Sequence, residues 1–296
     1  MLHVTNGDAA VPSLRAAGVE GDLLPWRDVL HDGPVPGGLA PAELRRVRAR
    51  FLARDGLLTE REAVRAFEVR DARVDAAAAA GEAVTLWFEA DLFDMLLLLQ
   101  VLDRLFEHAP LRMVLVGQDK WRSVNDVRPG TLAALGRTAP PVTREQRTLA
   151  HSAWAAFTAP DPAGLCELAR GTPALPAVGV ALRRLLEEYP ARHTGLSRTE
   201  RQLMEAVGAG ARTRKAAFEA AIRAEERPFL GDASAWAVLA RLAPLLDGAG
   251  LSERGRAVLA GREPWNPEEE RWIGGVRLPP GPAPWRWDPD AETLDD

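Results

Sequence analysis

Cysteine is almost missing from this sequence, as are segments that export or anchor a protein. Cys166 is the only cysteine, so no disulfide can form within the chain, which suits a reducing compartment. The start, MLHVTNGDAAV, has neither the basic nor the apolar segment of a secretory signal. The apolar run at residues 95–99 is flanked by Asp94 and Gln100 and is too short to cross a membrane. We therefore expect a cytoplasmic protein without membrane association.

Lysine is also scarce, because Lys120 and Lys215 are the only two lysines and arginine carries nearly all of the positive charge. The formal net charge is -5, which gives no general attraction to nucleic acid or to anionic membranes. The composition, 47% hydrophobic and 27% charged, is ordinary for globular proteins. The length of 296 residues is enough for about two domains.

Several familiar motifs are absent. The segment Asn6-Gly7-Asp8 contains one glycine and is not a glycine-rich phosphate loop. No Gly-x-Ser-x-Gly nucleophile elbow occurs, and no cysteines and histidines have the spacing of a zinc site. The histidines are scattered along the chain, at His3, His31, His108, His151 and His193. No motif of these kinds therefore identifies a reaction.

What the sequence does contain is an alternation of predicted strands and helices. Strands are predicted over residues 2–6, 21–27, 83–89 and 111–117, and the last two are continuously apolar, as in buried parallel strands. Helices are predicted between them, over residues 9–17, 40–54, 59–79 and 91–108. Strands alternating with helices indicate βαβ units. We therefore predict an α/β domain with a short parallel sheet over residues 1–127.

The remainder of the chain is predicted to be a mainly helical domain, over residues 128–288. Thr143 with Gln146, and Ser197 with Glu200, have the spacing of capping boxes that open helices. The end of the chain from residue 271 onward, RWIGGVRL…WRWD, is predicted to be a two-stranded β-ribbon whose turn is rich in proline and glycine. The acidic tail, residues 289–296, is predicted to be disordered.

The order of elements in this second half resembles a winged helix. Three predicted helices follow Leu196, and a short helix near residues 252–259 and the ribbon come after them. A DNA-binding protein of this kind needs a basic recognition helix. The third helix, DASAWAVLARLA, offers only Arg241. Nucleic-acid binding is therefore not favoured, and we expect a scaffold or a partner surface.

The candidate site consists of polar residues that follow the predicted strands. In open α/β sheets ligands bind at the carboxyl ends of the strands, so these residues should converge on one edge. Ligand-binding roles are assigned to Asn6, Gly7, Asp8, Arg27, Asp32 and Asp91. Catalytic roles are assigned to His31, Asp28 and Asp94. The third and fourth strands add Glu89, Gln118, Asp119 and Lys120 to the same edge.

Clustered carboxylates beside a histidine suit divalent-metal-assisted hydrolysis or phosphoryl chemistry. Asp8, Asp28 and Asp94 would hold Mg²⁺ or Mn²⁺, and His31 would act as general acid or base. Asp94 falls on the face of its predicted helix that also carries Leu98, so its carboxyl group should point inward, toward the strand ends.

Each of these residues also has a structural interpretation. Asp8 and Asp91 stand where helix N-caps are wanted, and capping alone would explain them. Asp91 and Asp94 have the spacing of a capping box, although Glu or Gln is the usual residue at the second position. His31 and Asp32, next to Gly33-Pro34, can be residues of a turn.

Long stretches of the chain resemble a bacterial family of uncharacterised proteins, domain of unknown function family 1835. The stretches are HVTNGDAA, WRDVLHDGPVP, LWFEADLFDMLLLLQVLDRL, GLSRTERQ, PFLGD and RWIGGV, and the resemblance covers most of the chain. It implies a fold but no particular activity. The sequence departs from the family pattern after Asp94, where Met95 and Leu97 stand in place of expected glutamines.

Three hypotheses of function follow. The leading one is a small-molecule or nucleotide-type site at the sheet edge. The first alternative is a regulatory module whose winged-helix-like half binds nucleic acid or a transcription protein. The second is a ligand sensor that uses the same pocket without catalysis. The sequence does not decide whether the protein is an enzyme, and it leaves the substrate and the oligomeric state open.

Overall fold

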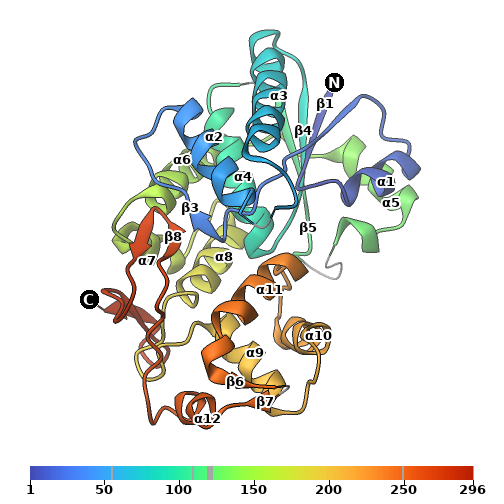
Figure 1. Cartoon of the computed structure of the whole chain (residues 1–296). Coiled ribbons are helices and arrows are strands. Elements are labelled where there is room, and N and C mark those ends of the chain that lie inside the picture. The colour runs from blue at the N-terminus through green and yellow to red at the C-terminus, as the bar shows by residue number, and fades with distance from the viewer. Residues whose placement is uncertain (55, 109, 119–122, 249, 296) are drawn as a thin grey trace.

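The centre of the computed structural model is a four-stranded parallel sheet (Figure 1). The structure describes residues 1–54, 56–108, 110–118, 123–248 and 250–295. The strands of the sheet are β1 (Leu2–Thr5), β2 (Asp22–Pro25), β4 (Val84–Glu89) and β5 (Leu111–Val116), in the order β2-β1-β4-β5. Each strand pairs in parallel with its neighbour. The predicted α/β class with a short parallel sheet is confirmed.

Helices surround the sheet and form most of the second half of the chain. Those of the first half are α1 (Ala10–Ala16), α2 (Pro41–Leu52), α3 (Glu60–Ala79), α4 (Leu92–Arg104) and α5 (Pro129–Thr138). Those of the second half are α6 (Arg144–Thr158), α7 (Ala163–Ala169), α8 (Pro176–Leu186), α9 (Arg198–Gly208), α10 (Arg214–Ala224), α11 (Asp232–Arg241) and α12 (Glu253–Leu259). The short 3-10 helices η1 (Val124–Asp126) and η2 (Ala243–Leu245) connect some of them. No helix in the described part of the chain is long and apolar enough to span a bilayer.

Side chains of β4 alternate between two cores, one on each face of the sheet. Leu86 and Phe88 pack with apolar residues of α3 and α4, whereas Trp87 packs on the other face with residues of α1 and α5. The α1 connection therefore crosses one face of the sheet, and the α3 and α4 connections cross the other. This doubly wound arrangement makes the strand order reverse at β1, which lies between β2 and β4.

The core on the α4 side continues well past residue 127. It joins Leu86 and Leu97 to Phe157 in α6, to Leu182 in α8 and to Ile273 near the end of the chain. α4 is buried on nearly every side because α6 and α8 pack against it. The proposed boundary between residues 127 and 128 therefore crosses a continuous core, and an N-terminal domain that folds alone stays a prediction.

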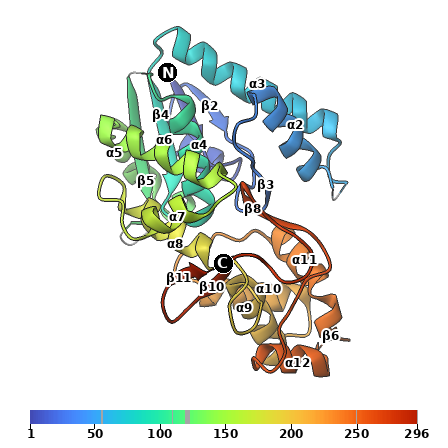
Figure 2. The same ribbon diagram turned by 90° about the vertical axis from the view of Figure 1, so that its left-hand side faces the viewer.

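A second core lies within residues 196–265. It is formed by α9, α10, α11 and α12, with a small hairpin of β6 (Leu246–Asp247) and β7 (Gly250–Leu251) before α12. We call this part the helical group, and Figures 1 and 2 show it at one end of the sheet. The predicted capping box of Ser197 and Glu200 opens α9, and that of Thr143 and Gln146 opens α6. The comparison with a winged helix stays a prediction.

The C-terminal strands pair differently from the prediction. β8 (Arg271–Gly274) and β9 (Val276–Leu278) form a hairpin, and β8 also pairs in parallel with β3 (Gly33–Pro34). The predicted ribbon paired the segment RWIGGVRL with the later segment WRWD, through the turn rich in proline and glycine between them. It was also predicted to belong to the helical domain. The later turn is wrong, because β9 follows directly as the antiparallel partner of β8. The pairing of β8 with β3 joins this segment to the first half of the chain, and its place in the helical domain stays a prediction.

The acidic tail is also ordered where the structure describes it. β10 (Arg286–Asp288) pairs in antiparallel fashion with β11 (Thr293–Asp295). Arg192 reaches both strands and contacts Asp288 and Asp295 at 3.2 Å. The prediction of a disordered tail is therefore wrong for these residues.

A buried network of ion pairs attaches the helical group to the rest of the molecule. Arg184 at the end of α8 donates to Glu225, which follows α10, over 2.7 Å, and to Glu188 over 2.7 Å. Arg271 of β8 donates to the other oxygen of Glu188 over 3.0 Å. Burial raises the pKa of Glu188, but Arg184 and Arg271 outweigh it and hold that pKa at about 2. Glu188 is therefore ionised at neutral pH and faces two charged arginines.

We expect Arg184→Met to destabilise the protein by about 3–5 kcal/mol, because it leaves the buried carboxylates of Glu188 and Glu225 short of a partner. Arg183→Met is the matched control, since Arg183 is half exposed and pairs with exposed Glu292, a kind of pair worth about 0–1 kcal/mol. Urea denaturation of the three proteins measures both effects. Equal losses in the two variants would contradict the role given to the network.

Candidate functional site

Asn6 and Asp94 meet at the point where the strand order reverses. Asn6 follows β1, and Asp94 lies in the first turn of α4, just after β4. The Asn6 side-chain Nδ2 donates to Asp94 Oδ1 over 2.9 Å, and the backbone N–H of Glu89 donates to Asp94 Oδ2. Asp94 thus ties the ends of two central strands together. In doubly wound sheets this switch point is the usual place for a ligand.

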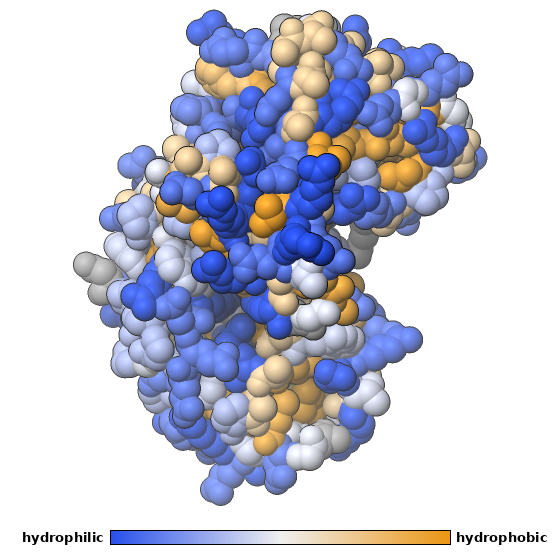
Figure 3. Space-filling model, turned by 45° about the horizontal axis from the view of Figure 1, so that its top comes forward, coloured by the Kyte–Doolittle hydropathy of each residue, from blue (hydrophilic) through white to orange (hydrophobic). Residues whose placement is uncertain are grey.

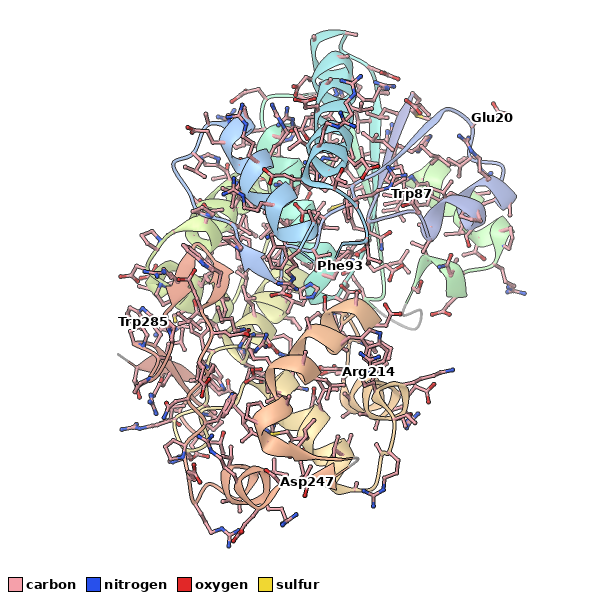
Figure 4. All side chains as sticks on the ribbon, viewed as in Figure 1. Glu20, Trp87, Phe93, Arg214, Asp247 and Trp285 are labelled. Atoms are coloured by element: carbon pink, nitrogen blue, oxygen red, sulfur yellow. The ribbon has the colours of Figure 1, made fainter. Side chains whose placement is uncertain are left out.

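A cavity of about 680 Å³ lies at this edge of the sheet, between the strand ends and the helical group. Its volume is in the range of small-molecule sites. Figure 4 shows Phe93 beside the cavity, near the junction with α11, and in Figure 3 the outline of the molecule is indented between its two parts. The strand ends contribute Asn6, Val29, His31, Glu89, Asp91, Phe93 and Asp94 to the lining. The helical group contributes Phe218, Glu219, Ile222, Arg223 and residues 228–234.

Three carboxyl groups lie at the sheet side of the cavity, and burial raises the pKa of each. Burial raises the pKa of Asp91 to about 7, and the neighbouring Glu89 adds to the shift. Burial, and then the charges of Asp91 and Glu89, raise the pKa of Asp94 well above its ordinary value. The pKa of Glu89 is raised by burial and, to a lesser degree, by Asp126. Asp91 is therefore partly protonated at neutral pH, and burial also favours the protonated forms of Glu89 and Asp94.

Asp91 caps α4, whereas the side chain of Asp94 has other partners. Asp91 is the N-cap of α4, because its Oδ1 accepts the backbone N–H of Asp94 over 2.9 Å. The oxygens of Asp94 accept from Asn6 and Glu89. Among the described residues, Asp94 makes no capping bond back to the backbone N–H of Asp91. Asp94 is almost completely buried, so its inward orientation agrees with the sequence interpretation.

His31 is a buried, neutral member of the lining. It is 8% exposed and contacts Phe93 and Phe229 with ring centroids 5.8 and 5.2 Å apart. Within the described residues, neither of its ring nitrogens has a hydrogen-bond partner. Burial lowers its pKa to about 4. At neutral pH the ring therefore has one N–H to donate and one nitrogen to accept.

The wall of the cavity formed by the helical group was not predicted. Phe229 and Leu230 belong to the loop before α11, and Phe218 and Ile222 belong to α10. The segment PFLGD, residues 228–232, was part of the family resemblance, but no function was predicted for it. Nothing local in the sequence says that this segment faces the end of β4.

Asp8, Arg27 and Gly7 do not belong to this cavity. Arg27 donates to both oxygens of Asp8, at 2.7 and 2.5 Å, and both side chains are mostly exposed. The hydrogen bonds from Arg27 lower the pKa of Asp8. Gly7 is absent from the lining, and its carbonyl accepts from the Thr5 hydroxyl. These residues therefore take no part in this cavity, and their ligand-binding roles stay predictions.

Asp28 has a structural partner instead of a catalytic position. Arg48 of α2 donates to its Oδ1 over 2.7 Å, and both side chains are almost fully buried. Arg48 also holds the backbone carbonyl groups of Val29 and Asp32, so it fixes the loop that leads to His31. Asp32 accepts from Arg54 over 3.1 Å and does not line the cavity. Neither residue lines this cavity, and the catalytic role of Asp28 and the ligand role of Asp32 stay predictions.

The expected metal ligands do not come together. The carboxylates of Asp8 and Asp28 are taken by Arg27 and Arg48, and only Asp94 lies in the cavity. In the described ranges no group of three His, Cys, Asp or Glu residues is arranged to hold a metal ion. Asp119 and Lys120, which were placed at the same edge, lie outside the described residues.

The remaining arrangement offers acceptors and proton-transfer groups. Asn6 Oδ1 is buried and has no hydrogen-bond partner within the described residues. Asp91, with a pKa near 7, can gain or lose a proton at neutral pH, as a general acid or base must.

Comparisons with protein-family models, with curated proteins and with solved structures find no match for the chain.

We expect Asp91→Asn to become more stable relative to the wild type as the pH rises from 4 to 7. The folded-state pKa of Asp91, about 7, lies above the value of about 3.9 expected in the unfolded chain. Such a group stabilises the fold below the lower value, and that stabilisation is lost as the pH rises through the higher one. The relative gain is at most about 1.4 kcal/mol per pH unit, and Asn keeps the helix cap.

Asp8→Asn is the control for this titration. Its pKa is lowered in the folded protein, so its contribution has the opposite sign: it is present at neutral pH and is lost on acidification. In urea denaturation between pH 4 and 7, the difference between Asp91→Asn and the wild type should change with pH, whereas the difference for Asp8→Asn should stay nearly constant and shrink only below about pH 4. A flat difference between Asp91→Asn and wild type over this range would show that Asp91 is ionised like an exposed carboxylate.

Proposed function

We propose that this protein binds a small organic molecule in the cavity between the carboxyl edge of its sheet and the helical group. The observation that carries the proposal is that two residues of the lining keep buried polar atoms without protein partners among the described residues. Asn6 Oδ1 and both ring nitrogens of His31 are such groups. An unpartnered buried polar atom costs roughly 1–3 kcal/mol. A ligand that completes these hydrogen bonds would recover that cost.

Acid–base chemistry on the bound molecule is a second part of the proposal. Asp91 supports it, because its pKa of about 7 suits proton transfer at neutral pH. Neutral His31 lines the same cavity. A sensor would need the same cavity but not this pKa, so proton exchange with a bound ligand separates an enzyme from a sensor.

We do not propose metal-assisted hydrolysis, because arginines occupy the carboxylates of Asp8 and Asp28. We also do not propose α11 as a DNA-recognition helix. It buries Ala235, Val238 and Leu239 in the helical core, and its first residues line the cavity. Membership of domain of unknown function family 1835 remains part of the proposal. Four of the segments that carry the resemblance contribute to the lining, namely HVTNGDAA, WRDVLHDGPVP, LWFEADLFDMLLLLQVLDRL and PFLGD.

Filling the cavity tests the proposed function. Ala233 is exposed in the first turn of α11 and lines the cavity, so Ala233→Trp should block it. Ala224 at the end of α10 is also exposed and does not line it, which makes Ala224→Trp the matched control. In saturation-transfer NMR with small-molecule fragment mixtures, we expect binders of the wild type to be lost in Ala233→Trp and retained in Ala224→Trp. Identical spectra for both variants would refute a ligand site in this cavity.

A further inference from the structure

We propose that the ligand of this cavity is an organic cation, namely an amine or amidine attached to an apolar body. The inference rests on the proposed function and specifies the chemical class of the ligand. It follows from three independent features of the lining: its charge, its hydrogen-bonding groups and its aromatic side chains.

The charged groups of the lining are mostly acidic. Glu89, Asp91 and Asp94 lie on the sheet side, and exposed Glu219 and Asp232 lie at the rim. Against these five carboxyl groups, the described lining has one guanidinium, that of exposed Arg223. His31 adds no positive charge at neutral pH, because its pKa is about 4. A cation would therefore be attracted to this cavity as these carboxyl groups give up their protons, and a phosphate or carboxylate would be repelled.

The hydrogen-bonding groups of the sheet side are mainly acceptors. Asn6 donates its amide N–H to Asp94, and its buried Oδ1 has no partner among the described residues. The carboxyl groups of Asp91 and Glu89 add further acceptor oxygens when they are ionised. Ammonium and amidinium groups carry several N–H donors and no acceptor, so they match this set. Charge-assisted bonds of this kind are about twice as strong as neutral ones.

Aromatic side chains supply the walls. Phe93 comes from α4, Phe229 from the loop before α11, and Phe218 from α10. One face of Phe229 lies against Arg184, whose guanidinium carbon is 4.9 Å from the ring centroid. Faces of aromatic rings attract organic cations in desolvated sites, and the rings also accommodate an apolar body. A hydrated inorganic ion would leave these walls unused.

Binding of a cation at this place is linked to proton release. Asp91 faces Asp94 and Glu89 and feels Arg227 from the loop after α10, and Glu89 also feels Asp126. An organic cation can replace the protons that these carboxyl groups retain near neutral pH. Its affinity should therefore increase as the pH rises through 7.

Three probes of one shape and different charge test the inference: benzamidine, benzyl alcohol and benzoate. Isothermal titration of the full chain above pH 7 should give benzamidine an affinity at least about tenfold higher than benzyl alcohol, with no detectable binding of benzoate. Repetition in buffers of different ionisation enthalpy should show protons released on benzamidine binding. Asp91→Asn should weaken benzamidine by about tenfold. Asp103→Asn, a carboxylate of α4 outside the cavity that contacts His151, should leave the affinity unchanged.

The outcomes separate the two proposals. If benzyl alcohol or benzoate binds as tightly as benzamidine, and Ala233→Trp abolishes that binding, the cation inference is overturned while the proposed function stands. If benzamidine does not bind at millimolar concentration, or binds equally well to Asp91→Asn, the cation inference is overturned as well. If benzamidine binds but Ala233→Trp has no effect, its site lies elsewhere and both proposals are overturned.

Discussion

The buried arginine Arg184 is the constraint on which the candidate site depends. It holds Glu188 at the end of α8 and Glu225 at the end of α10, and Glu188 in turn holds Arg271 of β8. The chain that leaves Glu225 runs directly into the loop that forms one wall of the cavity. Breaking one member of such a network leaves an uncompensated buried charge, so the network fixes where that loop starts. The position of α10 and α11 against the sheet edge follows from it.

Electrostatic repulsion among the buried carboxyl groups of the site destabilises the folded protein. Asp94 is buried beside Asp91 and Glu89, and the three cannot all be ionised without strong repulsion. Asn6 and the backbone N–H of Glu89 stabilise Asp94, but Asn6 keeps one oxygen without a partner in the described chain. A fold under selection for stability alone would replace such groups with apolar ones. Their presence at the switch point of the sheet is the reason to look for function there.

Much of the fold could be predicted because its signals are local. The apolar runs that became β4 and β5, the capping boxes at Thr143 and Ser197, and the helical periodicity around Asp94 depend on neighbours within a few residues. The errors concern pairing between distant segments. β8 joins β3 across more than two hundred residues, and the acidic tail is held by pairing with β10. No local pattern specifies such partners, so the ribbon and the tail were assigned wrongly.

For the site too, the sequence predicted what depends on local signals and missed what depends on contacts between distant segments. The sequence alone determined that Asn6, Asp91 and Asp94 lie at strand ends, because parallel strands place these positions on one edge, and it placed His31 in the loop after β2. Only the tertiary structure decided which carboxylates remain available. Asp8 and Asp28 looked equivalent to Asp94 in sequence, but Arg27 and Arg48 reach the first two. It also decided the cavity itself, whose second wall comes from α10 and α11. An ion pair or a cavity wall forms between side chains that are distant in the sequence and close in space. The sequence of one strand and its neighbours does not show which distant side chains will contact it.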